Sequence, residues 1–325
     1  MKEKGQQRRW SWKFVLPLLA CAISMALDII LPDMNSLINV SAGLPVYRWL
    51  LCIFALVFVI LAAVAYLHQD YRIRWIHKIP FYTAIILLLC LYNIVTKKSE
   101  VLQPIYFPSI DRIGTVFVED YKILLTCTAY SLRLVILGAG SGLIIGFIMG
   151  VLIGWNQRAY YWIFPLVRFI GPMPTTIWIP LAMLLFPTLL HAALFIVGLS
   201  MWFPVTFLTS SGIQGVRKSL FEAGSTLGAK TPYLIWHVAI PAAMPSIFTG
   251  IFMGMVSSLI SLVSAELIGA KYGLGWFINW QQQVMSYAEV YAGFLIIALI
   301  CFIIFRIVFS LRNKMLSWQK GSVRW

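Results

Sequence analysis

The chain has 325 residues, of which 61% are hydrophobic and 11% are charged, with a mean hydropathy of +0.86. Soluble domains carry roughly one quarter charged residues, so this composition excludes an ordinary soluble protein and indicates one embedded in a lipid bilayer. The formal net charge is +14, but the basic residues are spread over several polar segments instead of one patch. We therefore do not expect nucleic-acid binding.

Apolar runs long enough to cross a bilayer, which takes about 20 helical residues, recur along the chain. The clearest is 49–67, nineteen residues without a charge. The others lie near residues 14–32, 79–96, 123–153, 172–187, 190–209, 246–267 and 290–311. Backbone groups in lipid must be paired within each segment, so these runs are predicted to be helices. The fold class that follows is an all-α polytopic membrane protein with about eight transmembrane helices.

The first run follows several basic residues, as the apolar part of a signal peptide does. It contains Pro17 and Asp28, however, and no cleavage site of small residues comes after it. We expect this run to be retained as a helix.

Charge placement predicts the orientation of the spans. If the N-terminus is cytoplasmic, the cytoplasmic segments are 1–13, 68–78, the turn near 155–168, 210–245 and the tail from about 306. These segments hold eighteen of the 25 lysines and arginines but three of the eleven acidic residues. Such an excess of basic residues marks the cytoplasmic side of a membrane protein, and an even number of spans returns the C-terminus to that side.

The cysteines and histidines do not suggest a metal centre or a redox site. All five cysteines lie in apolar runs without C-x-x-C spacing, namely Cys21, Cys52, Cys90, Cys127 and Cys301. The four histidines form no cluster of ligands with one another or with the cysteines. We expect no metal and no cofactor in this chain.

The segment 210–245 is long for a connection between two spans, and long connections are usually functional or disordered. Val216, Leu220 and Ala223 recur at helical spacing, and Gly228 is a natural end for that helix. A second helix is predicted to begin at a Thr231 cap, with Pro232 at its first position, and to end at Pro241. Two such helices form either a docking surface for a soluble partner or a passive connector.

Within this segment, the residues Glu222-Ala223-Gly224-Ser225-Thr226-Leu227-Gly228 are followed nine residues later by Val238-Ala239-Ile240-Pro241. This pattern resembles the EAA signature of ABC importer permeases, E-A-A-x-x-x-G-x9-I-x-L-P. Gly224 stands where alanine is usual. The resemblance implies that this stretch is the coupling helix, seated in a cleft of an ATPase. The residues implied are Glu222, Ala223, Gly224, Leu227, Gly228 and Pro241.

Further stretches resemble the nitrate, sulfonate, taurine and bicarbonate branch of these permeases. They are 106–113, 131–138, 171–186 and 265–278. The resemblance covers about residues 79–311. It implies a core of six spans over 79–325, preceded by an N-terminal extension over 1–78 with two additional spans.

The family implies a division of labour between subunits. The resemblance implies that this chain is one half of a permease homodimer in the cell membrane of a prokaryote. Two cytoplasmic ATPase subunits and an extracytoplasmic binding protein would complete the transporter. The chain contains no G-x-x-x-x-G-K-[ST] motif, so ATP and its magnesium ion would be bound by the ATPase. The implied function is ATP-driven import of a small anionic or organic solute by alternating access.

A glycine cluster at 138–142 lies in an apolar run without a lysine, so it does not suggest a phosphate loop. Gly138, Gly142, Gly146 and Gly150 are spaced by four, which favours close packing against a neighbouring helix.

Candidate residues of the translocation path lie in the run 246–267. Ser257, Ser261 and Ser264 share one helical face, and Glu266 follows near the outer end. Polar groups in a span usually face the bundle or a water-filled cavity, although serine also bonds to its own helix. Arg133 is a candidate contact for an anion, but it could equally pair with an acid or extend to the interface.

Two other classes of protein are weighed against this one. An intramembrane enzyme would need a catalytic pair, and G-x-G-D, G-x-S-x-G and H-E-x-x-H are absent from the sequence. An ion-coupled secondary transporter is the stronger alternative, since it needs no ATPase. Such transporters often contain an internal repeat, but the sequence has no second copy of the 210–245 segment.

Overall fold

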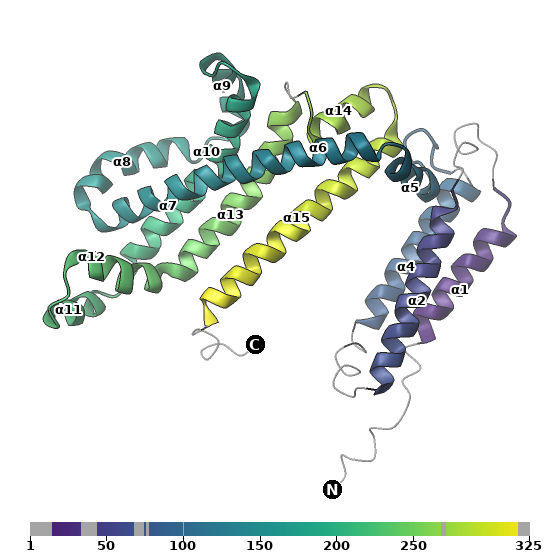
Figure 1. The fold of residues 1–325 in the computed structure, drawn as a ribbon, viewed down its shortest axis with the longest axis horizontal. Helices are drawn as coiled ribbons and strands as arrows, with labels where there is room; N and C mark the ends of the chain where they lie inside the picture. The colour runs from purple at the N-terminus through teal and green to yellow at the C-terminus, as the bar shows by residue number, and fades with distance from the viewer. Residues whose placement is uncertain are drawn as a thin grey trace, which may run out of the picture. The chain divides into compact units, whose positions relative to one another are not determined.

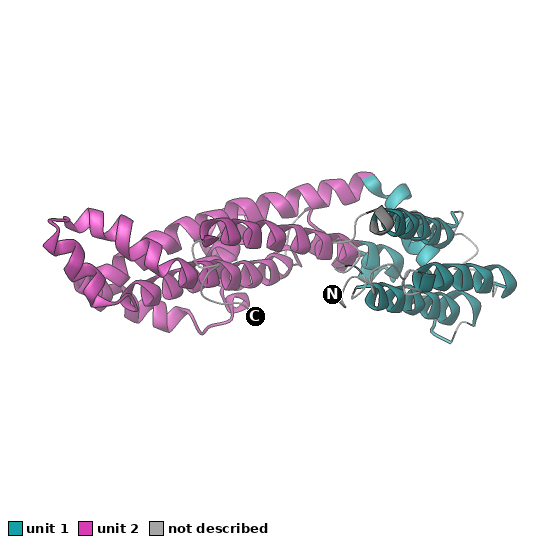
Figure 2. Cartoon of the chain, turned by 90° about the horizontal axis from the view of Figure 1, so that it is seen from below, with its two compact units in different colours: residues 1–121, 281–292 teal, residues 122–280, 293–325 magenta. Residues whose placement is uncertain are grey.

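The computed structural model describes residues 15–33, 44–67, 75, 78–99, 101–267 and 271–317, and in these ranges the regular secondary structure is helical (Figure 1). The chain divides into two compact units (Figure 2). Unit 1 comprises residues 1–121 and 281–292, and unit 2 comprises residues 122–280 and 293–325. Each unit is described separately below.

Six helices of the described chain are long and apolar enough to cross a membrane. They are Val46–Val64, Ile79–Lys98, Tyr121–Trp155, Leu189–Gln214, Thr231–Leu267 and Tyr287–Met315. A seventh span is possible if a helix pair bent by 95°, Gln157–Ile170 with Thr175–Leu185, counts as one. The predicted helical membrane fold is thus confirmed, whereas the count of eight is not. The first predicted span is present as a helix of 16 residues, Val15–Ile30, which is short for a bilayer.

Unit 1 is built on α1 (Val15–Ile30), α2 (Val46–Leu67) and α4 (Ile79–Asn93), followed by a π-helical turn η2 (Ile94–Lys98) and α5 (Ile110–Glu119). The first three helices pack around one apolar cluster. Its buried members are Ala20, Cys21, Tyr47, Leu51, Phe58 and Ile86. The predicted boundary at residue 78 falls inside this unit and stays a prediction.

Charged side chains join the same helices at their ends. Asp28 accepts hydrogen bonds from Arg48 Nε at 2.7 Å and Asn93 Nδ2 at 2.9 Å. Lys98 Nζ donates to the Asp28 carbonyl oxygen at 2.6 Å, at the end of α1, where a cation suits the helix dipole. Asp111 accepts from the Tyr47 N–H at 2.7 Å, at the start of α2. Opposite charges therefore close helix ends that would otherwise be unsatisfied in lipid.

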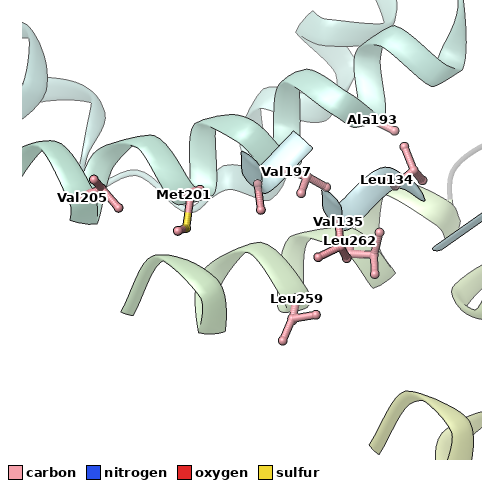
Figure 3. Packing of buried hydrophobic residues seen from close by; sticks show 9 residues of the cluster. Leu134, Val135, Ala193, Val197, Met201, Val205, Leu259 and Leu262 are labelled. Carbon is pink, nitrogen blue, oxygen red and sulfur yellow. The ribbon is translucent and has the colours of Figure 1, made fainter. Parts of the chain in front are cut away.

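Unit 2 contains the remaining helices. In chain order they are α6 (Tyr121–Leu134), η3 (Val135–Ala139), α7 (Gly140–Trp155), α8 (Gln157–Ile170), η4 (Thr175–Trp178), α9 (Ile179–Leu185), α10 (Leu189–Gln214), α11 (Lys218–Thr226), α12 (Thr231–Leu234), η5 (Ile235–Ala239), α13 (Ile240–Leu267), α14 (Leu274–Gln283) and most of α15 (Tyr287–Met315). Its main core joins α10 to α13 and to the α6–η3 region, and Figure 3 shows Val197, Met201 and Val205 of α10 facing α13.

The glycines of α7 confirm the predicted close packing, and the partner is α10. A Cβ added at Gly142 would lie 2.2 Å from the carbonyl oxygen of Gly198. One added at Gly146 would lie 2.8 Å from the Trp202 carbonyl oxygen, and one at Gly150 would lie 2.6 Å from Thr209 Cβ. The two helices therefore approach each other backbone to backbone, as small-residue interfaces allow in lipid.

Three predictions about helix boundaries were wrong. Pro241 does not end a helix, because η5 leads directly into α13 and the span runs without interruption over Thr231–Leu267. Proline lacks an N–H and crowds the preceding turn, and the wider π turn before it accommodates both effects. The segment 155–168, expected to be a cytoplasmic turn, contains α8 instead. The expected span 172–187 is helical over 175–185, and Gly171–Pro174, which contains two prolines, separates this part from α8.

Candidate coupling surface and translocation cavity

The segment from α11 to α12, residues 218–234 and here called the coupling segment, is a helix, a tight turn and a second helix, as predicted. Gly228 has φ +80°, a conformation that glycine adopts without strain. Its N–H bonds to the Ser225 carbonyl at 3.0 Å, and the Ala229 N–H bonds to the Gly224 carbonyl at 3.0 Å. These two bonds form a Schellman motif and satisfy the last carbonyls of α11. The predicted cap of the second helix was wrong by one residue. Lys230 occupies the cap position of α12, and Thr231 is the first helical residue.

The inner face of the coupling segment is held by apolar contacts. The ring of Phe221 packs edge-on against Trp155, with centroids 5.5 Å apart. A Cβ added at Gly224 would lie 2.6 Å from Leu234 Cδ2, so α11 and α12 pack closely at this point. The glycine that departs from the usual alanine of the signature thus lies under a buried leucine.

The outer face of the coupling segment carries exposed apolar side chains and one acid. Leu227 is 88% exposed, Leu220 and Tyr233 are also exposed, and so is Trp236 in η5, just after the segment. Glu222 is exposed, and the described residues offer it no ion-pair partner. Apolar groups clustered beside a free acid outside the predicted spans are typical of a protein-docking surface.

A cavity of about 430 Å³ lies between three elements. They are α10, α13 and the stretch after the end of α8 where the helix is broken. It is called the hydroxyl cavity here because, apart from the indole of Trp178, the polar side chains that line it are hydroxyls. They are Thr175, Thr176, Ser200, Ser257 and Ser261. Among the described residues that line it none is charged, and its remaining walls are apolar, aromatic or proline side chains.

Ser261 is the centre of the hydroxyl groups. Its Oγ lies 2.6 Å from Thr175 Oγ1 and 2.6 Å from Ser200 Oγ, and the Ser200 hydroxyl is the donor of the second bond. Three elements far apart in sequence therefore meet at one serine. A hydroxyl donates one hydrogen bond and accepts two, so this group can exchange partners with a passing polar solute.

The structure brings two of the five candidate path residues together. Ser257 and Ser261 line the hydroxyl cavity. Ser264 does not line it, and its hydroxyl bonds to the carbonyl of Ile260 in its own helix. Glu266 is fully buried against Ser131 and Gly275, away from the cavity. Arg133 is exposed on α6 and does not line the cavity either.

Sequence reasoning missed Thr175, Thr176 and Ser200. The hydroxyls of 175 and 176 follow Pro174, where the broken helix leaves a short 3-10 turn, so polar residues next to a proline break were the available signal. Ser200 gave none, because it is a single serine inside a long apolar run.

Comparisons with known proteins agree with this architecture. Residues 142–317 match the family described as "Binding-protein-dependent transport system inner membrane component". A putative aliphatic sulfonates transport permease of Bacillus subtilis is 33% identical over 186 residues, 57% of this chain and 66% of that protein. The taurine transport system permease of Escherichia coli is 26% identical over 191 residues, 59% of this chain and 70% of that protein.

A putative ABC transporter permease of Methanocaldococcus jannaschii is 28% identical over 225 residues, 67% of this chain and 84% of that protein. Among solved structures, a chain of the MetNI methionine ABC transporter in inward facing conformations superposes with a TM-score of 0.53 and 18% identity. That match covers 60% of this chain and 96% of the other, and it shows the shared fold. The chain therefore belongs to the family of binding-protein-dependent transport system inner membrane components, the permease subunits of ABC importers.

Proposed function

We propose that this permease imports a small oxyanion or organic anion, driven by separate ATPase subunits that bind and hydrolyse ATP-Mg. Two copies of the chain would form the channel, and an extracytoplasmic binding protein would deliver the solute. The observation that carries the proposal is the coupling segment, where exposed Leu227 and Glu222, which has no ion-pair partner among the described residues, lie beside a glycine turn. An ion-coupled secondary transporter would have no use for such a surface.

The substrate class is inferred from relatives together with the hydroxyl cavity. The relatives are described as permeases for aliphatic sulfonates, taurine and bicarbonate. Sulfonate and bicarbonate present several oxygen acceptors, which serine and threonine hydroxyls can meet as donors. The described residues that line the cavity include no cation, so it would hold an anion weakly and release it readily. Weak binding suits a site through which the solute only passes.

The proposed cycle is alternating access in the inner membrane of a prokaryote, with the coupling segment on the cytoplasmic side. Closure of the two ATPases on ATP would draw the paired coupling segments together. Since α12 continues through η5 into α13, the displacement would reach Ser257 and Ser261 along one helix. The hydroxyl cavity would then change the side on which it opens.

The experiment is co-purification of the ATPase with the permease, followed by ATP hydrolysis and uptake in vesicles. Glu222→Lys should weaken ATPase binding at least about tenfold, because reversing a charge at a docking surface leaves the partner's charge unpaired. Gly228→Ala should weaken it by up to about fivefold, since a side chain at positive φ costs about 1 kcal/mol. Gly228→Asn should stay close to the parent, because asparagine tolerates this conformation.

Thr249→Ala is the matched control, since this exposed hydroxyl bonds only to the Pro245 carbonyl of its own helix. It should bind the ATPase and transport normally. Parent-like binding and uptake by both Glu222→Lys and Gly228→Ala would make the coupling segment a passive connector and overturn the proposal.

A further inference from the structure

The carboxyl group of Glu266, near the end of α13, lies in a buried polar cluster at the start of α14. The Ser131 hydroxyl on α6 donates to Oε1 at 2.6 Å, and the Gly275 N–H donates to Oε2 at 2.7 Å. Ser131 Oγ accepts in turn from the Leu274 N–H at 2.9 Å. Glu266 is 0% exposed and Ser131 is 2% exposed, so hydrogen bonds shielded from solvent join three helices here.

These bonds supply a cap that α14 lacks in its own sequence. The first N–H groups of a helix have no partner inside it, and the preceding side chain usually accepts one of them. The preceding residue is Gly273, which has no side chain. Glu266 and Ser131 accept from the first two N–H groups instead, and both acceptors come from other helices.

Two glycines allow this close approach. Gly273 has φ +147°, and a Cβ there would lie 2.6 Å from the carboxyl carbon of Glu266. A Cβ at Gly275 would lie 2.9 Å from the Val263 carbonyl oxygen. A side chain at either position would therefore push α14 away from α13 and break the cap.

The cluster lies at the far end of the helix that begins in the coupling segment. The helical span Thr231–Leu267 has 37 residues, about 55 Å at 1.5 Å per residue. It starts at α12, lines the hydroxyl cavity with Ser257 and Ser261, and carries Glu266 one residue before its end. Figure 1 shows α13 running from α12 toward α14. A push at one end of this helix thus meets a hydrogen-bonded attachment at the other.

We propose that Glu266 is a positioning residue that anchors the end of α13 to α6 and α14. A force at α12 then tilts α13 across the hydroxyl cavity instead of sliding the helix along its axis. The inference rests on the proposed function, because the ATPase is taken as the source of that force. Buried polar groups without alternative partners resist separation, which is the physical basis of the anchor.

Cys127 on α6 is a native reporter of this anchor. It is 0% exposed and lies one helical turn before Ser131 on the buried face of α6. Cys301 on α15 serves as an internal reference.

The test treats the complete transport complex with N-ethylmaleimide and reads the modification of each cysteine separately by mass spectrometry. It also measures the amount of solute transported per ATP hydrolysed. The variants are Glu266→Ala, Glu266→Gln and Ser131→Ala. The control is Thr126→Ala, whose hydroxyl bonds only within α6.

Glu266→Ala should raise the modification rate of Cys127 about tenfold or more, because two bonds to the carboxyl group are lost. The rate at Cys301 should not change, the ATPase should still co-purify, and solute transported per ATP should fall. Glu266→Gln should show smaller changes of the same kind, since its amide oxygen can still accept from Gly275. Thr126→Ala should match the parent in every measurement.

An assembled Glu266→Ala complex with parent-like Cys127 modification or parent-like transport per ATP overturns the anchor. If Glu266→Ala does not accumulate, Glu266→Gln and Ser131→Ala decide by the same two measurements. Failure of the parent to bind any ATPase removes the proposed function instead, and Cys127 modification still reports separately on the seating of α14.

Discussion

Ser261 is the residue through which the hydroxyl cavity can be tested most directly. It contacts hydroxyls on two other elements at 2.6 Å each and lines the cavity. Ser261→Leu replaces a donor with a branched apolar side chain and should reduce uptake at least about tenfold. Ser261→Ala keeps the volume open and leaves Thr175 and Ser200 free to bind solute, so it should retain most uptake.

The measurement for these variants is solute uptake into vesicles, with ATPase co-purification as the check on assembly. Ser261→Leu that assembles and transports at the parental rate would remove the cavity from the path. Because Ser261 lies far from the coupling segment in sequence, a defect confined to uptake with normal ATPase binding would separate the two sites.

At this scale the sequence predicted what depends on one helix and missed what depends on several. The spacing of Ser257 and Ser261 placed both on one face, and the glycine at 228 was identified as the end of a helix; both hold in the structure. Ser264 falls on that face too, yet its hydroxyl bonds to its own helix, and Glu266, expected only to lie near the outer end, bonds to Ser131 on α6 and to the start of α14. The spacing of residues along one helix does not show which hydrogen-bond partners other helices supply.

At the scale of elements, the contact of α7 with α10 yields a matched pair of variants. Gly142→Ala introduces a Cβ 2.2 Å from the Gly198 carbonyl oxygen, whereas a Cβ at Gly140 has nothing within 4 Å. Forcing a methyl group into a packed interface lowers the free energy of unfolding by about 1–3 kcal/mol. Gly142→Ala should therefore lower the Tm of the purified protein by several degrees. Gly140→Ala should leave it unchanged or raise it, because alanine favours helix over glycine.

Thermal unfolding in detergent, followed by the loss of the monodisperse peak on size exclusion, measures both variants. Equal Tm values for the two would mean that α7 and α10 are not in backbone contact. The pair uses the same substitution on the same helix, so differences in helix propensity largely cancel.

Helix existence was predictable from apolar runs, but helix ends were less so. The sequence predicted a stop at Pro241, yet a π turn absorbs the proline and keeps one span over Thr231–Leu267. The run 172–187 was expected to form one span, yet the helix pair on either side of Gly171–Pro174 is bent by 95°. A proline predicts a local disturbance, but packing against neighbouring helices decides whether the helix bends, bulges or stops.

At the scale of the molecule, the family was accessible from short motifs, while the role of the first part of the chain was not. The relatives quoted above align with 57–67% of the chain, so a large part has no counterpart in those alignments. In unit 1, charged side chains of α1, α2, η2 and α5 join the helices. Such pairing depends on helices meeting in space, and a single sequence does not predict which acid pairs with which base.

Orientation is the remaining property of the whole molecule that the charge pattern predicts. Of the positions suited to cysteine labelling, Gly43 and Gln69 lie outside the described residues, whereas Ser99 and Ser219 are described and exposed. Ser99 follows Lys97 and Lys98 at the end of a predicted span, and Ser219 lies in α11. With the coupling segment in the cytoplasm, Ser99→Cys should react with an impermeant thiol reagent in intact cells, and Ser219→Cys should react only after permeabilisation. Labelling is measured in a background without the five native cysteines.

Ser99 and Ser219 are separated by the spans Tyr121–Trp155 and Leu189–Gln214 and by the bent pair Gln157–Ile170 with Thr175–Leu185. An odd number of crossings puts them on opposite sides, so this pattern would show that the bent pair crosses the membrane. Labelling of Ser219→Cys from outside would instead reverse the orientation and place the coupling segment where no ATPase can reach it.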